Sequence, residues 1–345
     1  MAFSSNGLKK YWRGMMKKDL NKRVIPTLDS HYASLEAFAS IPVYLGKIDN
    51  EIPPQVAPKC FLGAWYRKVY SSKDAWLGIE GTIRLGEFTP DDKRYGSDGR
   101  TFWDRYLDNP SIYMGGQSVS ESDAGLGWMA GYETLDTSEP LNYGSKKICY
   151  RPFYRYIYSE VIDQEGNVIR NNVNSWNVTD PKRFEYYYFP GDLIKMSVYS
   201  PVENYLQLRI EVLETTTIPK YKALRDSYKL NNNHPSVYYS PLFFSEGHGK
   251  LNAEFKRVNS IDQYGNEGSN VKATQAKVSE ATWESVYLYR KIEGILHKVP
   301  FNLPRQTHMA CPNPESFTIT NTPEQQSKGG EIIAIHPKPL IEKEA

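Results

Sequence analysis

The sequence predicts an all-β protein, an antiparallel β-sandwich, and three observations support this prediction. First, apolar and polar residues alternate through residues 183–217, which is the period-two pattern of half-buried strands. The apolar members of the pattern are Ile194, Met196, Val198, Leu206, Leu208, Ile210 and Val212. Second, turn-forming residues at 190–192 and 200–204 interrupt the pattern and predict a meander. Third, short strand signals follow one another from residue 60 onward without regular helices between them.

The expected strands are bounded by Gly, Pro, Asn and Asp. They lie near residues 60–69, 75–85, 111–119, 125–134, 148–158, 167–177, 183–200 in two pieces, 204–215, 252–260, 282–291 and 295–301. One internal helix is expected at residues 219–228, because Pro219 suits the first turn of a helix.

The N-terminal segment has the pattern of a basic amphipathic helix. At residues 6–20, apolar side chains recur at intervals of three and four, with lysine and arginine around them. Such a helix docks on its own domain, docks on a neighbouring subunit, or lies on an anionic membrane, and the membrane is the least favoured of these. A second helix is expected after Asp29 or Ser30, ending near Ala39.

We expect three parts in the chain of 345 residues. They are a helical N-terminal arm of residues 1–44, a β-sandwich domain of residues 45–320 and an extended C-terminal tail of residues 321–345. The tail is predicted from its composition, which is rich in Pro, Thr, Glu, Gln, Lys and Gly. One large sandwich with appendages is preferred to two domains, because single all-β domains reach about 200–250 residues.

The charge balance argues against a nucleic-acid partner. Lys and Arg number 42 and Asp and Glu number 40, so the net charge of +2 supplies no bulk attraction to nucleic acid. No segment reaches the roughly 18 consecutive apolar residues of a membrane span, and no apolar run resembles a signal peptide. A cytoplasmic location is therefore expected, with a secreted mature form as the alternative.

The cysteines do not predict a disulfide framework or a metal site. Cys60, Cys149 and Cys311 lack metal-ligand spacing, and their odd number cannot form a complete set of disulfides. Buried free thiols in a reducing compartment are the expectation. No metal and no cofactor are expected, since no phosphate-binding glycine loop precedes a helix.

Four short motifs carry a family resemblance. The chain reads Trp-Leu-Gly-Ile-Glu-Gly at 76–81, Asp-Ala-Gly at 123–125, Pro-Phe-Tyr-Arg-Tyr at 152–156 and Gly-Asp-Leu-Ile-Lys-Met-Ser-Val at 191–198. These motifs resemble strands of the glutamic peptidases (eqolisins), which belong to the concanavalin A-like jelly rolls together with lectins and glucanases. The resemblance covers about residues 60–215 and implies a jelly-roll topology for the sandwich.

Two further motifs resemble a bacterial jelly-roll family without an assigned activity. They are Tyr-Tyr-Tyr-Phe-Pro-Gly-Asp at 186–192 and Tyr-Leu-Gln-Leu-Arg-Ile-Glu-Val at 205–212. This second resemblance supports the fold and implies no chemistry.

The chain departs from the peptidase pattern at the two catalytic positions. Where that family has its catalytic Gln and Glu, this chain has Asp123 and Arg155. A glutamic peptidase needs a carboxyl group that exchanges a proton with water, which a guanidinium cannot do. If the two residues face each other, we expect an ion pair. Enzymatic activity is not favoured, and the weak catalytic candidates are Asp123, Glu80 and Glu133.

Two other catalytic classes also lack a full set of residues. Glu121 and Asp123 begin the acidic pattern of jelly-roll glucanases, but the third carboxylate is replaced by Gly125 and Leu126. His248 lies between two glycines, and no Ser or Cys in a nucleophile elbow accompanies it.

The aromatic residues allow a sugar-binding hypothesis. The binding candidates are Trp65, Tyr66, Trp76, Trp103 and Trp128, joined by Arg155. Aromatic rings stack on sugar rings along a concave sheet, and they also dominate the cores of β-sandwiches. Both interpretations of these residues stay open at this point.

The preferred function is a non-catalytic, self-associating structural protein. We expect a homo-oligomer or a higher assembly formed through the N- and C-terminal arms, because the sequence shows two arms and no catalytic set. The first alternative is a lectin-like protein with a glycan as its partner. The second is an acid peptidase or glycosidase related to the jelly-roll enzymes.

Overall fold

The structure is a computed structural model of the whole chain. It describes residues 41–54, 59–91, 93–94, 107–132, 147–157, 161–162, 168–170, 174–228, 237–263 and 266–338. The two helices predicted before Ala39 lie outside these ranges, so the helical arm stays a prediction.

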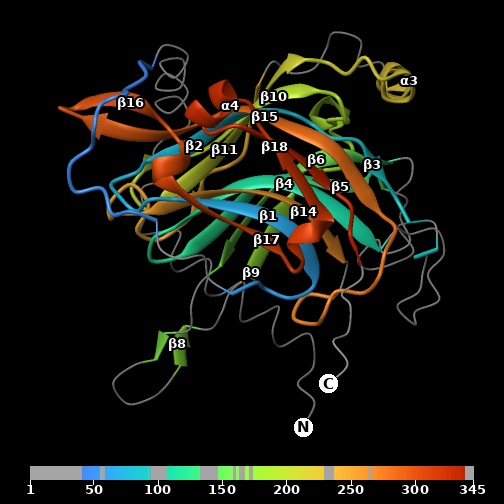
Figure 1. Cartoon of the computed structure of the whole chain (residues 1–345), viewed down its shortest axis with the longest axis horizontal. Coiled ribbons are helices and arrows are strands. Elements are labelled where there is room, and N and C mark those ends of the chain that lie inside the picture. The colour runs from blue at the N-terminus through green and yellow to red at the C-terminus, as the bar shows by residue number, and fades with distance from the viewer. Residues whose placement is uncertain are drawn as a thin grey trace. The chain divides into compact units, whose positions relative to one another are not determined.

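Two antiparallel sheets form a sandwich, which confirms the predicted all-β fold (Figure 1). The first sheet has seven strands. In spatial order they are β17 (Gln306–Cys311), β1 (Ala64–Ser71), β14 (Glu254–Gln263), β4 (Asp108–Gln117), β5 (Glu121–Ala130), β6 (Lys147–Ile157) and β9 (Asn174–Val178).

The second sheet has ten strands. Its main path is β12 (Val237–Tyr239), β11 (Tyr205–Glu214), β10 (Leu193–Val202), β2 (Gly78–Arg84), β15 (Lys277–Ile292), β19 (Glu331–Ile335) and β18 (Phe317–Thr320). Beside this path, β13 (Phe243–Phe244) pairs with β11, while β16 (Ile295–Pro300) and β3 (Phe88–Thr89) pair with β15. A separate small hairpin joins β7 (Val161–Ile162) and β8 (Val168–Arg170).

Helical segments in the described part of the chain are few and short. They are α3 (Pro219–Ser227), α4 (Pro323–Ser327) and the 3-10 turns η3 (Phe184–Tyr186), η4 (Leu303–Arg305) and η5 (Pro314–Ser316). The position of α3 confirms the one internal helix that Pro219 predicts. Among the described segments, no helix combines the length and the apolar character needed to cross a membrane.

The predicted meander is the pair of strands β10 and β11. Asn204 has a φ of 65°, in the left-handed region, and it turns the chain between Val202 and Tyr205. Before β10, Gly191 has a φ of 89° and Asp192 is fully buried. The Asp192 carboxylate accepts the backbone N–H of Thr216 at 2.7 Å and the guanidinium of Arg225 at 2.7 and 2.5 Å. One buried acid thus ties the start of β10 to helix α3.

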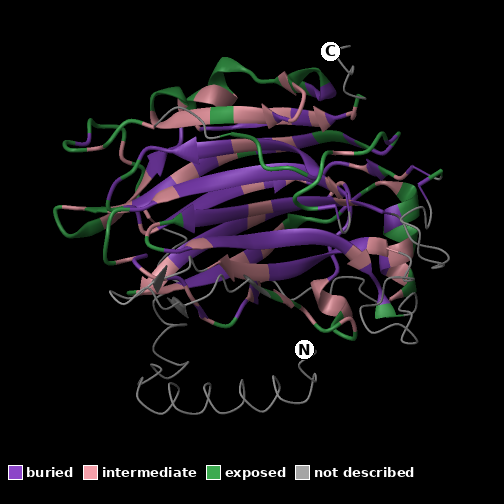
Figure 2. Ribbon diagram, turned by 90° about the horizontal axis from the view of Figure 1, so that it is seen from below, coloured by how far each residue is buried: buried purple, intermediate pink, exposed green. Residues whose placement is uncertain are grey.

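The core lies between the two sheets, where the strands carry their buried residues (Figure 2). Trp65, Trp76 and Trp283 are among the largest side chains in this core, with 0 or 1% of their surface exposed. Every second residue of a strand therefore faces the core. In the seven-stranded sheet, the remaining residues point away from the core and form the outer face of that sheet.

The C-terminal segment departs from the predicted extended tail. Residues 331–335 form β19, a strand between β15 and β18 inside the larger sheet. Its Glu331 lies across the sandwich from the seven-stranded sheet and pairs with Arg67 of β1 at 2.9 Å and Arg257 of β14 at 2.7 Å. The prediction of a tail from residue 321 is therefore wrong for this strand, because a short apolar run and a buried ion triad outweigh the polar composition around them.

A second correction concerns residues 183–189, which were expected to form the first of two strand pieces. They contain the 3-10 turn η3, and Tyr187 to Phe189 continue into the core with almost no exposed surface. Aromatic residues suit strands and buried turns alike, so composition did not separate the two.

Candidate functional site

The outer face of the seven-stranded sheet carries a groove of about 750 Å³. Side chains of β1, β14, β4, β5, β6 and β9 line it, and the loop before β1 forms one wall. Asp123 and Arg155 both line this groove, so they are not buried against each other in the interior.

One row of residues crosses the six strands of the groove, and all of its members except Gly115 line the groove. The register places Tyr70, Lys256, Gly115, Asp123, Arg155 and Trp176 opposite one another in that order. With about 4.8 Å between neighbouring strands, the five intervals of this row span about 24 Å. The row combines an aromatic residue at each end with charged residues between them.

Lys256 and two carboxylates form a buried ion cluster in the floor of the groove. The Lys256 Nζ lies 2.7 Å from Asp123 Oδ1 and also pairs with Glu121. Gly115 leaves room for this reach, since an added Cβ would lie 3.0 Å from Lys256 Cε and 1.9 Å from a backbone oxygen of Ser122. Lys256 lowers the pKa of Glu121 to about 2, so Glu121 is a carboxylate at neutral pH.

The predicted ion pair between Asp123 and Arg155 is replaced by other partners. The two residues are direct neighbours in register, but Asp123 pairs with Lys256 while the Arg155 guanidinium lies 3.4 Å from Glu267. The Arg155 side chain is 18% exposed and so presents part of its donor group to the groove. Sequence alone does not give the strand order, so it does not place Lys256 of β14 within reach of Asp123.

Three aromatic residues form a platform beside the charged row. The ring of Trp176 stacks on Phe153 with centroids 4.4 Å apart and planes 11° apart, and Tyr113 meets Phe153 edge-on at 5.9 Å. Half of the Trp176 surface is exposed. Trp176 thus offers an indole to solvent on a support that fixes its orientation.

Asp262 of β14 also lines the groove. Burial raises the pKa of its carboxyl to about 6. Two hydrogen bonds lower this pKa, but their effect is smaller than that of burial. One of these comes from the Ser111 hydroxyl at 3.4 Å, and Ser111 also contacts the Ser260 hydroxyl at 2.6 Å. Asp262 therefore keeps its proton to a higher pH than an exposed aspartate, whose pKa is about 3.9.

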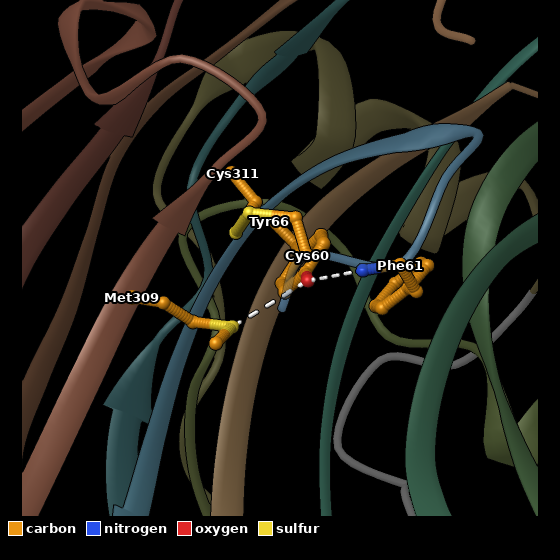
Figure 3. Close-up of a disulfide and its surroundings, with 5 residues drawn as sticks. All are labelled: Cys60, Phe61, Tyr66, Met309 and Cys311. Atoms are coloured by element: carbon orange, nitrogen blue, oxygen red, sulfur yellow. Dashed lines mark hydrogen bonds between the residues drawn. A yellow bond between two sulfur atoms is a disulfide. The ribbon is translucent and has the colours of Figure 1, made fainter. Parts of the chain in front are cut away.

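A disulfide between Cys60 and Cys311 holds the wall of the groove (Figure 3). Next to it, the Phe61 ring stacks on Tyr66 at 4.0 Å and the Phe61 N–H donates to the Tyr66 hydroxyl at 2.9 Å. That hydroxyl in turn donates to the sulfur of Met309 at 3.5 Å. The prediction of three free thiols is wrong for this pair, while Cys149 is free and buried.

The tryptophans proposed for sugar binding lie elsewhere. Trp65 and Trp76 are buried in the core, and Trp128 is 5% exposed with its ring edge-on to Tyr150 at 5.0 Å. These three pack between the sheets and present no face to a sugar. Tyr66 does line the groove, beneath Phe61.

Two catalytic candidates fall outside the site or outside the described residues. Glu80 is buried on β2 of the other sheet, where it accepts from the Tyr289 hydroxyl at 2.6 Å and pairs with Lys298 at 2.6 Å. Glu133 and the binding candidate Trp103 lie outside the residues that the structure describes. Within the described ranges, no three His, Cys, Asp or Glu side chains come together as a metal site.

Several groove residues were missed from the sequence, namely Lys68, Tyr113, Phe153, Trp176, Lys256 and Asp262. The sequence signal that could have found some of them is the alternation of side chains along a strand. Phe153 and Arg155 are two residues apart on one strand and therefore lie on the same face of the sheet. That rule joins residues within a strand, whereas the groove is assembled from six strands distant in sequence.

Comparison with known proteins gives structural neighbours only. No protein-family model matches the sequence, and no curated protein does. Among solved structures, scytalido-glutamic peptidase with a transition state analog inhibitor is 12% identical, with a TM-score of 0.42, over 81% of this chain and all of the peptidase. SCP-B, a member of the eqolisin family of peptidases in complex with the tripeptide Ala-Ile-His, is 10% identical, with a TM-score of 0.38, over the same shares of the two chains. These neighbours belong to the family that the sequence motifs resemble, and at such identities no activity is carried over.

Proposed function

We propose that this protein binds a carbohydrate chain in the groove of the seven-stranded sheet. The observation that carries the proposal is Trp176, whose half-exposed indole is stacked on Phe153 at the edge of the groove. A sugar ring has an apolar C–H face that packs on an aromatic ring and polar edges that need hydrogen bonds. The groove offers both types of contact side by side.

The polar contacts come from the charged row next to the platform. Asp123 and Arg155 occupy adjacent positions in register with Trp176, and Glu121 lies two residues from Asp123 on the same face of β5. Hydrogen bonds from hydroxyl groups to ionised side chains are stronger than those between neutral groups. The row of about 24 Å has room for several linked sugar rings along it.

The groove is a better candidate site for binding than for peptide hydrolysis. Arg155 occupies the position where the resembling family has its catalytic acid, and a guanidinium cannot transfer a proton at working pH. Asp123 is held by Lys256 at 2.7 Å. An acid-pH casein assay on the wild type and the Asp123→Ala variant tests the peptidase alternative directly, and we expect no cleavage by either protein.

The disulfide indicates the compartment in which the protein works. Disulfides persist in oxidising compartments and are rare in a reducing cytosol. The bond between Cys60 and Cys311 therefore favours the secreted alternative over the cytoplasmic expectation. An extracellular location also gives access to the glycans of cell surfaces.

Self-association through the two arms stays a separate prediction, because residues 1–40 and 339–345 lie outside the described ranges. Light scattering of the full chain and of a form lacking residues 1–25 tests it. An oligomer that dissociates on deletion supports assembly through the arm, and monomers in both forms contradict it.

A glycan array tests the proposed function. The wild type, the Trp176→Ala variant and the Tyr132→Ala variant are applied side by side, since Tyr132 is a 44% exposed aromatic residue outside the groove. We expect hits for the wild type and Tyr132→Ala, and about tenfold weaker binding by Trp176→Ala, which corresponds to about 1.4 kcal/mol. An array without hits, or equal binding by all three proteins, would overturn the proposal.

A further inference from the structure

Two lysines of the groove differ in how their charges are compensated. Lys256 is the register partner of Tyr70, and Lys68 lies two residues before Tyr70 on the same face of β1. Both lysines line the groove. Lys256 takes Asp123 and Glu121 as its ion-pair partners.

Lys68 lacks such a partner. Among the residues that the structure describes, no carboxylate lies within ion-pair distance of its Nζ, which sits 4.5 Å from the centroid of the Tyr70 ring. The side chain is partly buried, yet it borders the groove. The Tyr70 ring covers the ammonium without offering a full negative charge.

The charged groups that act on Lys68 come from two other strands of the same sheet, the adjacent β14 and the more distant β5. Lys256 and Glu254 project from β14, and Glu121 and Asp123 project from β5. On the other side, β17 places the uncharged Met309 opposite Lys68. The two acids of β5 are engaged by Lys256, and the charge of Lys256 acts on Lys68 more strongly than the charge of any one of these carboxylates.

These surroundings favour the neutral amine. Burial, and then the charge of Lys256, lower the pKa of Lys68 to about 8. At pH 7.5 about a quarter of the amine is then neutral, against about one in a thousand for a lysine with the ordinary pKa of about 10.4. A lysine beside another cation in a partly desolvated site is the arrangement in which an amine acts as a nucleophile.

We propose that Lys68 is a nucleophile that forms an imine with an aldehyde held in the groove. The aldehyde class that the groove would supply is the open-chain carbonyl of a reducing sugar, and this choice of source depends on the proposed carbohydrate binding. The reactivity of Lys68 itself depends only on its own surroundings.

The step balances without an oxidant or a reductant. The lone pair of the neutral Nζ attacks the carbonyl carbon, the C=O π electrons move to oxygen, and one proton passes from nitrogen to that oxygen. The resulting carbinolamine loses its hydroxyl group and the second nitrogen proton as water, which leaves a C=N bond. Lys256 is unsuited to the same step because Asp123 and Glu121 raise its pKa above the ordinary value despite burial.

Reductive trapping on the full chain tests the proposal. The protein is incubated with glycolaldehyde and sodium cyanoborohydride, and peptide mass spectrometry gives the labelling rate at Lys68 and at the exposed Lys73 outside the groove. At pH 7.5 we expect Lys68 to be labelled at least tenfold faster than Lys73, with a half-maximal rate near pH 8. Equal rates, or labelling of Lys68 that rises only above pH 9, would overturn the proposal.

Labelling and array binding, measured on the same protein, separate this inference from the proposed function. The Lys68→Arg variant removes the amine, so we expect it to lose the fast-labelled site. Fast labelling of Lys68 in a protein without array hits would leave the nucleophile in place and exclude a glycan as the source of its aldehyde. Array hits together with slow labelling of Lys68 would overturn the nucleophile alone.

Discussion

Removal of the Cys60–Cys311 disulfide should destabilise the fold strongly. The bond joins residues 251 positions apart, so it closes a loop that contains most of the sandwich. For a loop of this length the chain-entropy relation gives about 5.5 kcal/mol, and removal of native disulfides usually costs about 2–5 kcal/mol. We therefore expect the Cys60→Ser, Cys311→Ser double variant to lose at least about 2 kcal/mol of unfolding free energy.

Urea unfolding followed by tryptophan fluorescence measures this loss, because Trp65, Trp76 and Trp283 are buried in the native state. The reductant dithiothreitol supplies the matched control. It should lower the stability of the wild type toward that of the double variant and leave the double variant unchanged. A difference below about 1 kcal/mol, or equal sensitivity of both proteins to dithiothreitol, would refute the assignment of the disulfide.

Two further predictions concern the ion triad that joins the sheets. Glu331→Gln leaves Arg67 and Arg257 buried without their counter-ion, so we expect a loss of about 3–5 kcal/mol in urea unfolding. Glu324→Gln removes an exposed partner of Lys328 and should leave the stability almost unchanged, and equal losses in the two variants would contradict this account. Burial would raise the pKa of Glu331, but the two arginines outweigh it and lower that pKa to about 2 from 4.5. Its contribution is therefore complete above pH 4.5 and is lost as the pH falls toward 2, so the acid sensitivity of the wild type in this window should be smaller in Glu331→Gln.

Local patterns in the sequence predicted most of the strands. The alternation through β10 and β11 and the turn at Asn204 are confirmed, as is helix α3 after Pro219. Each of these features depends on residues close together in the chain, where period and turn chemistry act directly. The C-terminal β19 was missed because its five residues lie within a polar segment and are fixed by contacts with β15 and β18.

The groove was harder to predict because it depends on strand order. Trp65 and Trp176 are both strand tryptophans, yet one is buried in the core and the other is half exposed. The alternation of apolar and polar residues predicts that a strand has two different faces. It does not predict which face packs against the second sheet. The partner of Asp123 was likewise hidden, since Lys256 lies 133 residues away and reaches it across Gly115.

A crystal structure of the protein with an oligosaccharide selected from the array tests the central claim most directly. The account predicts a sugar ring parallel to the Trp176 indole, with its hydroxyl groups within hydrogen-bond distance of Asp123 or Arg155. An oligosaccharide bound away from the seven-stranded sheet, or one that leaves Trp176 uncovered, would contradict it.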